Sequence, residues 1–156
     1  MKNVWRYVVA VVLAEAVGFI GALSMGNAVS GWYATLNKPV FNPPSWIFAP
    51  VWTLLYALMG VSFVVMYDAR GTAEEKHEAE AWFFVQLFLN AIWTPVFFGL
   101  HAPGWALLVL FALLLALIGT VLRFARVSKA AAWLLTPYLA WAGFAFVLNF
   151  AVWRMN

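Results

Sequence analysis

The chain has 156 residues, of which 66% are hydrophobic, 19% are aromatic and only 10% are charged. Soluble domains carry roughly a quarter charged residues, so a water-exposed surface could not accommodate this composition. The sequence has no cysteine, which excludes disulfides, cysteine-ligated metals and thiol catalysis. The net charge of +3 is spread over several loops, which argues against a nucleic-acid partner. The composition indicates an integral membrane protein whose first partner is the lipid bilayer.

Five apolar runs are long enough to cross a bilayer, which takes about 20 residues at a rise of ~1.5 Å per residue. They occupy residues 4–25, 45–67, 79–100, 104–123 and 130–153. These runs predict an all-α integral membrane fold, a five-transmembrane-helix bundle in which residues 1–156 form a single domain. A signal peptide is the alternative for the first run. Glu15 at its centre and the small residues Ala14, Gly18 and Ala22 favour a retained helix that packs closely.

Basic residues are distributed unevenly between the two ends of such a bundle. Most of them flank one end, namely Lys2, Arg6, Arg70, Lys76, Arg123, Arg126 and Lys129, whereas Lys38 and Arg154 flank the other. Positively charged loops tend to remain in the cytoplasm. We therefore predict a multi-pass protein of a bacterial cell membrane, with a cytoplasmic N-terminus and a C-terminus on the opposite side.

The first loop, residues 26–44, is rich in aromatic residues and proline. Proline restricts the backbone and lowers the entropy that is lost on ordering. Trp32, Tyr33 and Phe41 carry rings that are poorly suited to water. We therefore expect a lid that folds over the outer end of the bundle. The alternative is an anchor that lies on the lipid surface.

Polar and aromatic side chains recur at helical spacing in two of the runs. One face of the third run combines Gln86, Asn90, Trp93 and Phe97, and one face of the fifth combines Tyr138, Trp141, Ala145 and Asn149. Amides in hydrocarbon are expected to face the bundle interior. Together with Trp52, at similar depth in the second run, these faces predict an aromatic cavity for a small molecule. Pro95 and Pro137 would bend the helices and help to open it, although plain helix packing is the alternative.

Two further residues could carry chemistry. Glu15 lies deep in the first run without a cation at its depth, so a neutral, hydrogen-bonded acid is expected there. The functional alternative for Glu15 is proton coupling or cation binding, as in small proton-driven exporters. His101, in a tight outer turn, could ligate a haem-type iron, although a solvated histidine is the simpler interpretation. No other spacing predicts a catalytic residue, a metal site or an obligatory cofactor.

Motifs in several segments give the chain a specific resemblance. They are Trp32-Tyr33, Lys38-Pro39, Pro43-Pro44 with Trp46, Pro50-Val51-Trp52, Gln86 to Gly99 with Asn90 and Trp93, and Pro137-Tyr138 with Trp141. In these motifs and their order the chain resembles the TspO/MBR family. That family comprises bacterial tryptophan-rich sensory proteins and the mitochondrial translocator protein, formerly called the peripheral benzodiazepine receptor.

The resemblance implies a five-helix bundle, usually a homodimer. Its pocket beneath the first loop would bind porphyrins such as protoporphyrin IX or haem, and isoquinoline or benzodiazepine ligands. By motif, the ligand-binding residues would be Tyr33, Pro43, Trp52, Asn90, Trp93, Trp141 and Ala145, and Phe97 joins them from the shared helix face. A motif for cholesterol late in the fifth helix is matched at Val147 and Arg154, with Phe150 in place of its tyrosine.

These features predict a membrane protein that binds a tetrapyrrole and senses, sequesters or transports it. Two alternatives stay open. Trp52 and Trp141 match tryptophans linked to light-dependent porphyrin degradation in some members, which would make the protein an enzyme. A proton-coupled exporter of small molecules would instead depend on Glu15, although the sequence lacks the internal repeat of many transporters.

Overall fold

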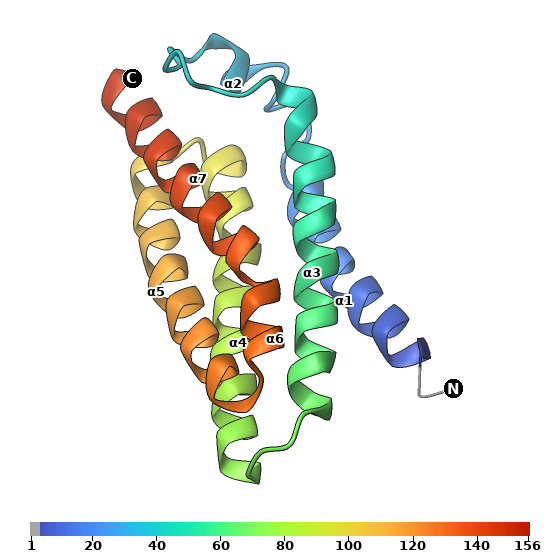
Figure 1. Cartoon of the computed structure of the whole chain (residues 1–156). Helices are drawn as coiled ribbons and strands as arrows, with labels where there is room; N and C mark the ends of the chain where they lie inside the picture. The colour runs from blue at the N-terminus through green and yellow to red at the C-terminus, as the bar shows by residue number, and fades with distance from the viewer. Residues whose placement is uncertain (1–3) are drawn as a thin grey trace.

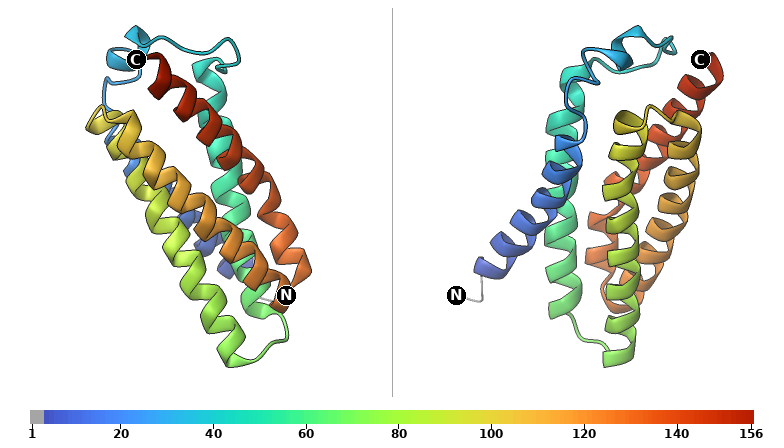
Figure 2. Two further views of the ribbon diagram at one scale, coloured as in Figure 1. Left: turned by 90° about the vertical axis from the view of Figure 1, so that its left-hand side faces the viewer. Right: turned by 180° about the vertical axis from the view of Figure 1, so that it is seen from behind.

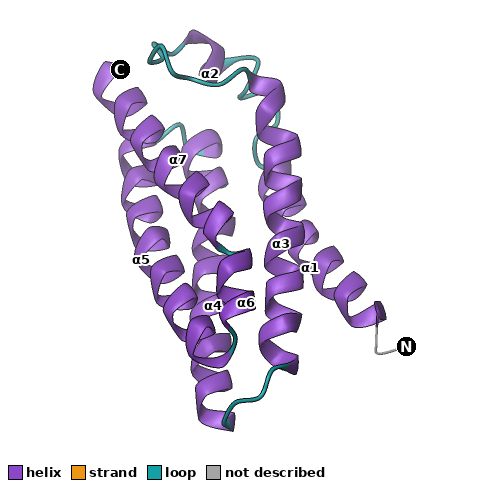
Figure 3. Cartoon of the chain, in the orientation of Figure 1, coloured by secondary structure: helices purple, strands orange, loops and turns teal. Residues whose placement is uncertain are grey.

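The computed structural model describes residues 4–156, and this part of the chain is helical without any strand (Figure 3). Its long helices are α1 (Val4–Leu23), α3 (Phe48–Asp68), α4 (Ala73–Thr94), α5 (Pro103–Val127) and α7 (Thr136–Met155). Shorter elements are α2 (Trp32–Thr35), a 3₁₀ turn (Ser45–Ile47), a π-helical turn (Pro95–Gly99) and α6 (Lys129–Leu134). Five segments among these residues are long and apolar enough to span a membrane, which confirms the predicted fold class. Lys2, used above to orient the chain, lies outside the described residues.

The third membrane-spanning helix begins earlier than its apolar run predicts. Hydrophobicity placed its start at residue 79, whereas α4 begins at Ala73. The backbone N–H of Glu75 donates to the Thr72 hydroxyl across 3.2 Å, and the Thr72 N–H donates to the Glu75 carboxylate across 2.9 Å. This reciprocal capping box satisfies two N–H groups that a helix end would otherwise leave free. The polar residues that follow are therefore helical, although they lie beyond the apolar run.

The fifth membrane-spanning segment consists of two helices. Leu135 separates α6 from α7, and Pro137 lies in the first turn of α7, where its missing N–H costs no hydrogen bond. Pro95 similarly begins the π-helical turn, in which the N–H of Leu100 donates to the Pro95 carbonyl across 2.9 Å. Both prolines lie at interruptions of a helix, and both interruptions are next to the region described below as a cavity.

The helices pack as two groups, which contact each other where α6 meets α3 and where α1 meets α4. In Figures 1 and 2, α1 runs alongside α3, while α4, α5 and α7 pack together. The backbones of α1 and α3 come close at Gly60, where a Cβ atom would lie only 2.7 Å from Cα of Val11. Fully buried side chains, including Met59, Leu117 and Phe124, fill the half of the bundle near the α3–α4 connection. The solid core therefore occupies the end opposite to the first loop.

Residues 26–44, which we call the lid segment, lie across the other end of the bundle (Figure 1). The ring of Trp32 stacks on His101 with centroids 4.4 Å apart. The N–H of Asn37 donates to the side-chain oxygen of Asn156 across 2.9 Å, and the Asn156 amide donates back to the Asn37 carbonyl across 3.0 Å. Val40 is nevertheless fully exposed. The lid segment thus contacts the bundle on its inner side and presents apolar surface on its outer side, as an interfacial anchor would.

Candidate ligand-binding cavity

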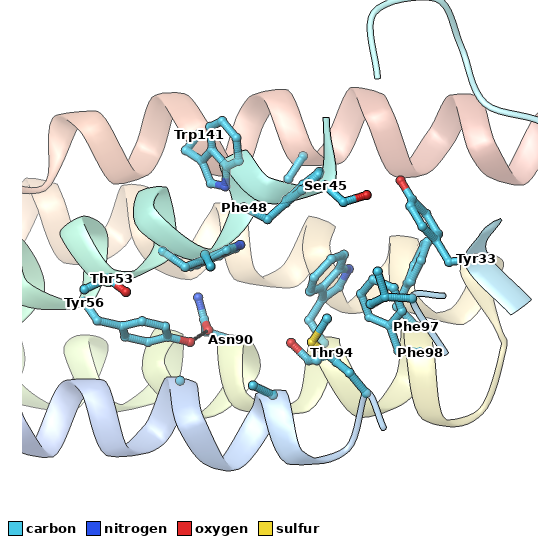
Figure 4. A pocket seen from close by; sticks show the side chains of 18 of the residues that line it. Tyr33, Ser45, Phe48, Thr53, Tyr56, Asn90, Thr94, Phe97, Phe98 and Trp141 are labelled. Carbon is cyan, nitrogen blue, oxygen red and sulfur yellow. Dashed lines mark hydrogen bonds between the residues drawn. The ribbon is translucent and has the colours of Figure 1, made fainter. Parts of the chain in front are cut away.

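A cavity of about 500 Å³ lies between α1, α3, α4 and α7, beneath the lid segment (Figure 4). Sites for drug-sized ligands typically measure roughly 300–1,000 Å³. The indoles of Trp52, Trp93 and Trp141 belong to three different helices, and all three line this space. The cavity can therefore surround a flat apolar molecule with aromatic faces from several directions.

Most of the residues that the sequence singled out as ligand-binding meet in the walls of this cavity. They are Tyr33, Trp52, Asn90, Trp93, Phe97, Trp141 and Ala145. Pro43 is not among the lining residues. Its carbonyl accepts a hydrogen bond from Asn42, whose side-chain oxygen accepts one from Tyr33, so Pro43 lies behind the wall. Binding itself stays a prediction for all of them.

Asn90 is the centre of a buried hydrogen-bond chain at the inner end of the cavity. The Tyr56 hydroxyl donates to Asn90 Oδ1 across 2.5 Å, and Asn90 Nδ2 donates to the Tyr138 hydroxyl across 2.6 Å. All three side chains are buried, and they connect α3, α4 and α7. A buried amide that is paired in this way is stabilising, whereas an unpaired one would be costly. The chain therefore forms a rigid floor whose polar groups are already satisfied.

Asn149 holds a second wall in place. Trp93 Nε1 donates to Asn149 Oδ1 across 3.1 Å, and Asn149 Nδ2 donates to the Pro103 carbonyl at the start of α5 across 2.8 Å. These bonds fix the plane of the Trp93 indole relative to α7. Gln86, predicted on the same face of α4, lies in the core instead, with its amide 3.9 Å from the Met59 sulfur. The predicted inward-facing side of α4 therefore contributes Trp93 to the cavity wall and Gln86 to the core.

Trp141 differs from Trp93 because its indole nitrogen is buried without a hydrogen-bond partner in the described part of the chain. Its ring packs against Phe48 and Phe144, with centroids 6.0 Å and 5.4 Å away. In Figure 4 this indole hangs from α7 above the space between the helices. A buried N–H group without a partner is unfavourable. Since this nitrogen is closed to solvent, Trp141 meets the cavity through the carbon face of its ring.

Tyr33 closes the cavity at the lid. Its hydroxyl donates to Asn42 Oδ1 across 2.8 Å, and its ring packs edge-on against Phe97 and Phe98. Burial raises the pKa of the Tyr33 phenol. The ammonium group of Lys38 lies 4.9 Å from the centroid of the same ring. The mouth of the cavity therefore has a cation beside it.

The π-helical turn brings two consecutive phenylalanines to the cavity. In a regular α-helix, neighbouring side chains point about 100° apart, so they seldom share a wall. Phe97 and Phe98 nevertheless both line the cavity, with ring centroids 4.8 Å apart. Turns of this kind often occur at functional sites. The irregularity that Pro95 introduces therefore enlarges the aromatic surface under the lid segment.

The first helix contributes a wall that sequence reasoning missed. Glu15, Gly18 and Ala22 line the cavity, and a Cβ atom added to Gly18 would collide with the ring of Tyr56. The signal was present, because these residues follow each other at i, i+3 and i+7 on one helix face. Ala14, grouped with them as a packing stripe, is instead buried in the core. The stripe was expected to serve helix packing, and Glu15 was expected to be a neutral, hydrogen-bonded acid, with proton coupling or cation binding as the alternative.

Two other groups of predicted residues lie apart from the cavity. His101 is not in the lining, and its ring stacks on Trp32. Val147, Phe150 and Arg154, matched to the sterol motif, are exposed on the outer side of α7. Residues 4–156 contain no group of three His, Cys, Asp or Glu side chains that could hold a metal ion. Any guest of the cavity would accordingly be held by aromatic packing and by few polar groups.

Together, the five spans, the aromatic cavity and the lid segment define a multi-pass membrane protein with an internal aromatic cavity. The sequence profile of the TspO/MBR family matches residues 10–154, and the chain belongs to this family. It is 38% identical to the tryptophan-rich protein TspO of Chlorobaculum tepidum, over 99% of this chain and 98% of that protein. It is 39% identical to the translocator protein of Homo sapiens, over 100% and 94% of the two chains. With protein CrtK of Rhodobacter capsulatus it shares 37% identity over 96% and 92%.

Proposed function

We propose that this protein binds a tetrapyrrole, a porphyrin or haem, in the cavity beneath the lid segment, and so senses, sequesters or transports it. The observation that carries the proposal is the enclosure of about 500 Å³ by three indoles from separate helices. A tetrapyrrole is a large, flat and largely apolar ring, and offset stacking on aromatic faces favours such a shape. The names of the relatives, which describe a sensory protein and a translocator, support a role in sensing or transport.

Charge around the cavity indicates how such a guest would be oriented. Among the described residues that line the cavity there is no lysine, arginine or histidine. The carboxylates of a natural porphyrin would be costly to bury there without a partner. Lys38, beside Tyr33 at the mouth, is placed to meet them. The macrocycle would then lie between the indoles, with its acidic edge toward the lid segment.

The test is a titration of the purified protein in detergent with protoporphyrin IX, followed by the shift of the porphyrin absorption band. Trp141→Ala removes one aromatic wall of the cavity, so we expect about tenfold weaker binding. The matched control is Trp105→Ala, which removes the same side chain from an exposed position at the start of α5. Equal affinities of Trp141→Ala and the wild type would refute the cavity as the binding site.

Further parts of the proposal concern other ligands and the assembly. Isoquinoline and benzodiazepine ligands would share the cavity. A sterol would lie on the exposed side of α7 near Phe150.

We further propose a homodimer in a bacterial cell membrane with a cytoplasmic N-terminus. Protease access to tags at the two ends of the chain in sealed vesicles tests the orientation.

Export remains the second candidate, because Glu15 lies in the cavity wall. A carboxyl group that faces both a guest and the membrane interior could couple proton movement to transport. Porphyrin flux from proteoliposomes, measured with and without a pH gradient, tests this. If the flux depends on the pH gradient and Glu15→Gln abolishes it, proton coupling is supported. If Glu15→Gln leaves the flux unchanged, proton coupling through Glu15 is ruled out.

A further inference from the structure

Glu15 is distinguished by its surroundings as well as by its charge. It lies in α1 and lines the cavity together with Gly18, one turn further along the helix. Among the described residues that line the cavity, Glu15 is the one carboxylic acid. The other ionisable groups there are tyrosine phenols, and none is basic. The cavity therefore has one carboxyl group in a wall that is otherwise aromatic, aliphatic or neutral.

No neighbour of Glu15 donates a hydrogen bond to this carboxyl group. Within residues 4–156, no hydrogen bond or ion pair involves the Glu15 side chain. The Tyr56 hydroxyl has one proton and donates it to Asn90, and the side-chain amide of Asn90 donates to Tyr138. A polar group at membrane depth is costly without a partner. A guest that occupies the cavity is therefore the natural source of the missing donor.

Aromatic rings near Glu15 favour the same kind of donor. The ring of Tyr56 packs against Gly18, and its centroid lies 5.7 Å from that of Trp52. Faces of tyrosine and tryptophan attract cations, the more strongly where water is excluded. An acid beside two electron-rich rings is a suitable environment for an ammonium group and an unfavourable one for an anion.

We propose that Glu15 makes the cavity selective for flat, apolar molecules that carry an amine, with the amine paired to the Glu15 carboxyl group. An amine suits either protonation state of the pair, because it can donate as an ammonium ion to a carboxylate or accept the proton of a carboxylic acid. This inference rests on the proposed cavity and adds charge selectivity to it. Guests with a carboxylate at that end would be excluded.

The experiment compares porphyrins that differ only in the charge of their side arms. The neutral probe is protoporphyrin IX dimethyl ester, and the cationic probe is the corresponding bis(aminoethyl) amide. Binding to the purified protein in detergent is measured by the shift of the porphyrin absorption band. We expect the wild type to bind the amine at least tenfold more tightly than the ester, since hydrogen bonds to charged groups are among the stronger ones. Glu15→Gln should abolish this preference.

Two control variants separate charge from fold. Glu15→Asp keeps the carboxyl group and should retain part of the preference. Glu78→Gln removes one negative charge from an exposed position on α4, where its partner Arg126 is 4.0 Å away, and should change nothing. A preference that persists in Glu15→Gln, or that is absent from the wild type, would overturn the inference.

A second probe pair distinguishes this inference from the proposed function. 1-Aminomethylpyrene and 1-methylpyrene are flat aromatic molecules without a tetrapyrrole ring. If both porphyrins fail to bind, the proposed function is wrong. The inference then stands if the aminated pyrene binds more tightly in a manner that depends on Glu15, and fails if the two pyrenes bind alike.

Discussion

Tyr56 and Asn90 join α3 to α4 through a buried hydrogen bond of 2.5 Å, at the level where the solid core gives way to the cavity. Because the Asn90 amide also donates to Tyr138, one side chain connects three helices. Removal of Asn90 would leave two tyrosine hydroxyls without this partner at the inner end of the cavity. The floor of the cavity therefore depends on a single amide.

We expect Asn90→Leu to lower the apparent melting temperature in detergent. Each hydroxyl left unpaired costs about 1–3 kcal/mol, because the desolvation of a buried polar group is no longer compensated. The measurement is thermal unfolding followed by circular dichroism. The control is the triple variant Tyr56→Phe, Asn90→Leu, Tyr138→Phe, which removes all the polar groups together and should recover much of the loss. A triple variant less stable than Asn90→Leu would contradict this account.

The Tyr33 phenol should make the lid segment sensitive to alkaline pH. Burial raises its pKa above the ordinary value of 10.0, so the folded position favours the neutral phenol. The stability that the buried neutral phenol gives to the closed lid segment is fully present below pH 10.0 and is lost as the pH rises through the higher pKa. We therefore expect bound porphyrin to be released faster as the pH rises through this raised pKa. Tyr33→Phe cannot ionise, so it should show no such increase. A similar rise in both proteins would assign the effect to another group.

The contact between Asn37 and Asn156 should slow the exit of a guest. Asn156→Ala removes both hydrogen bonds, each worth about 0.5–1.5 kcal/mol. We expect bound porphyrin to dissociate at least about 5-fold faster, measured by stopped-flow transfer to an apolar acceptor. Ser30→Ala in the same lid segment loses only a local bond to the Asn27 carbonyl and serves as control. Unchanged dissociation from Asn156→Ala would show that the lid segment does not limit exit.

The enzymatic alternative has its own test. If the indoles of Trp52 and Trp141 take part in light-dependent porphyrin degradation, the double variant Trp52→Phe, Trp141→Phe should bleach bound porphyrin several-fold more slowly under illumination. Phenylalanine keeps an aromatic wall but is harder to oxidise than indole. The control is Trp105→Phe, Trp133→Phe, which alters two exposed tryptophans. Bleaching at the wild-type rate in the first variant would eliminate the idea.

His101 is expected to have a structural role in the lid rather than to ligate iron. It adopts a positive φ of 51°, which glycine tolerates, and its ring stacks on Trp32 outside the cavity lining. His101→Gly therefore preserves the turn and removes only the imidazole. We expect the absorption spectrum of bound haem to keep its band positions in this variant. A shift of those bands would identify His101 as an iron ligand.

The fold was predictable because the bilayer imposes a simple rule on the sequence. Apolar runs of sufficient length gave the five spans, and buried amides such as Asn90 and Asn149 had to face inward. The start of α4 at Ala73 was not predictable from hydrophobicity, because the capping box of Thr72 and Glu75 extends a helix through polar residues. Likewise, α5 extends to Val127 beyond its predicted end at residue 123, since helix ends do not have to coincide with the membrane boundary.

Sequence spacing predicted the candidate site where residues share a face of one membrane-spanning segment, and depth and motif added Trp52 and Tyr33. Spacing on α4 and α7 identified Trp93, Phe97, Trp141 and Ala145. The wall from α1 was missed, because which face of α1 turns to the cavity depends on its packing against α3. Pro43 was placed in the site by motif alone, and the conformation of the lid segment turns it behind Asn42.

The close approach of α1 and α3 at Gly60 affects which guests the cavity can accommodate. A relative with a different residue at this position would accommodate other guests. Val11, which touches Gly60, lies one helical turn before Glu15, about 6 Å along the axis. Any side chain at position 60 would act as a wedge and tilt α1 outward, carrying Glu15 and Gly18 with it. The width of the chamber therefore depends on a glycine that does not line it.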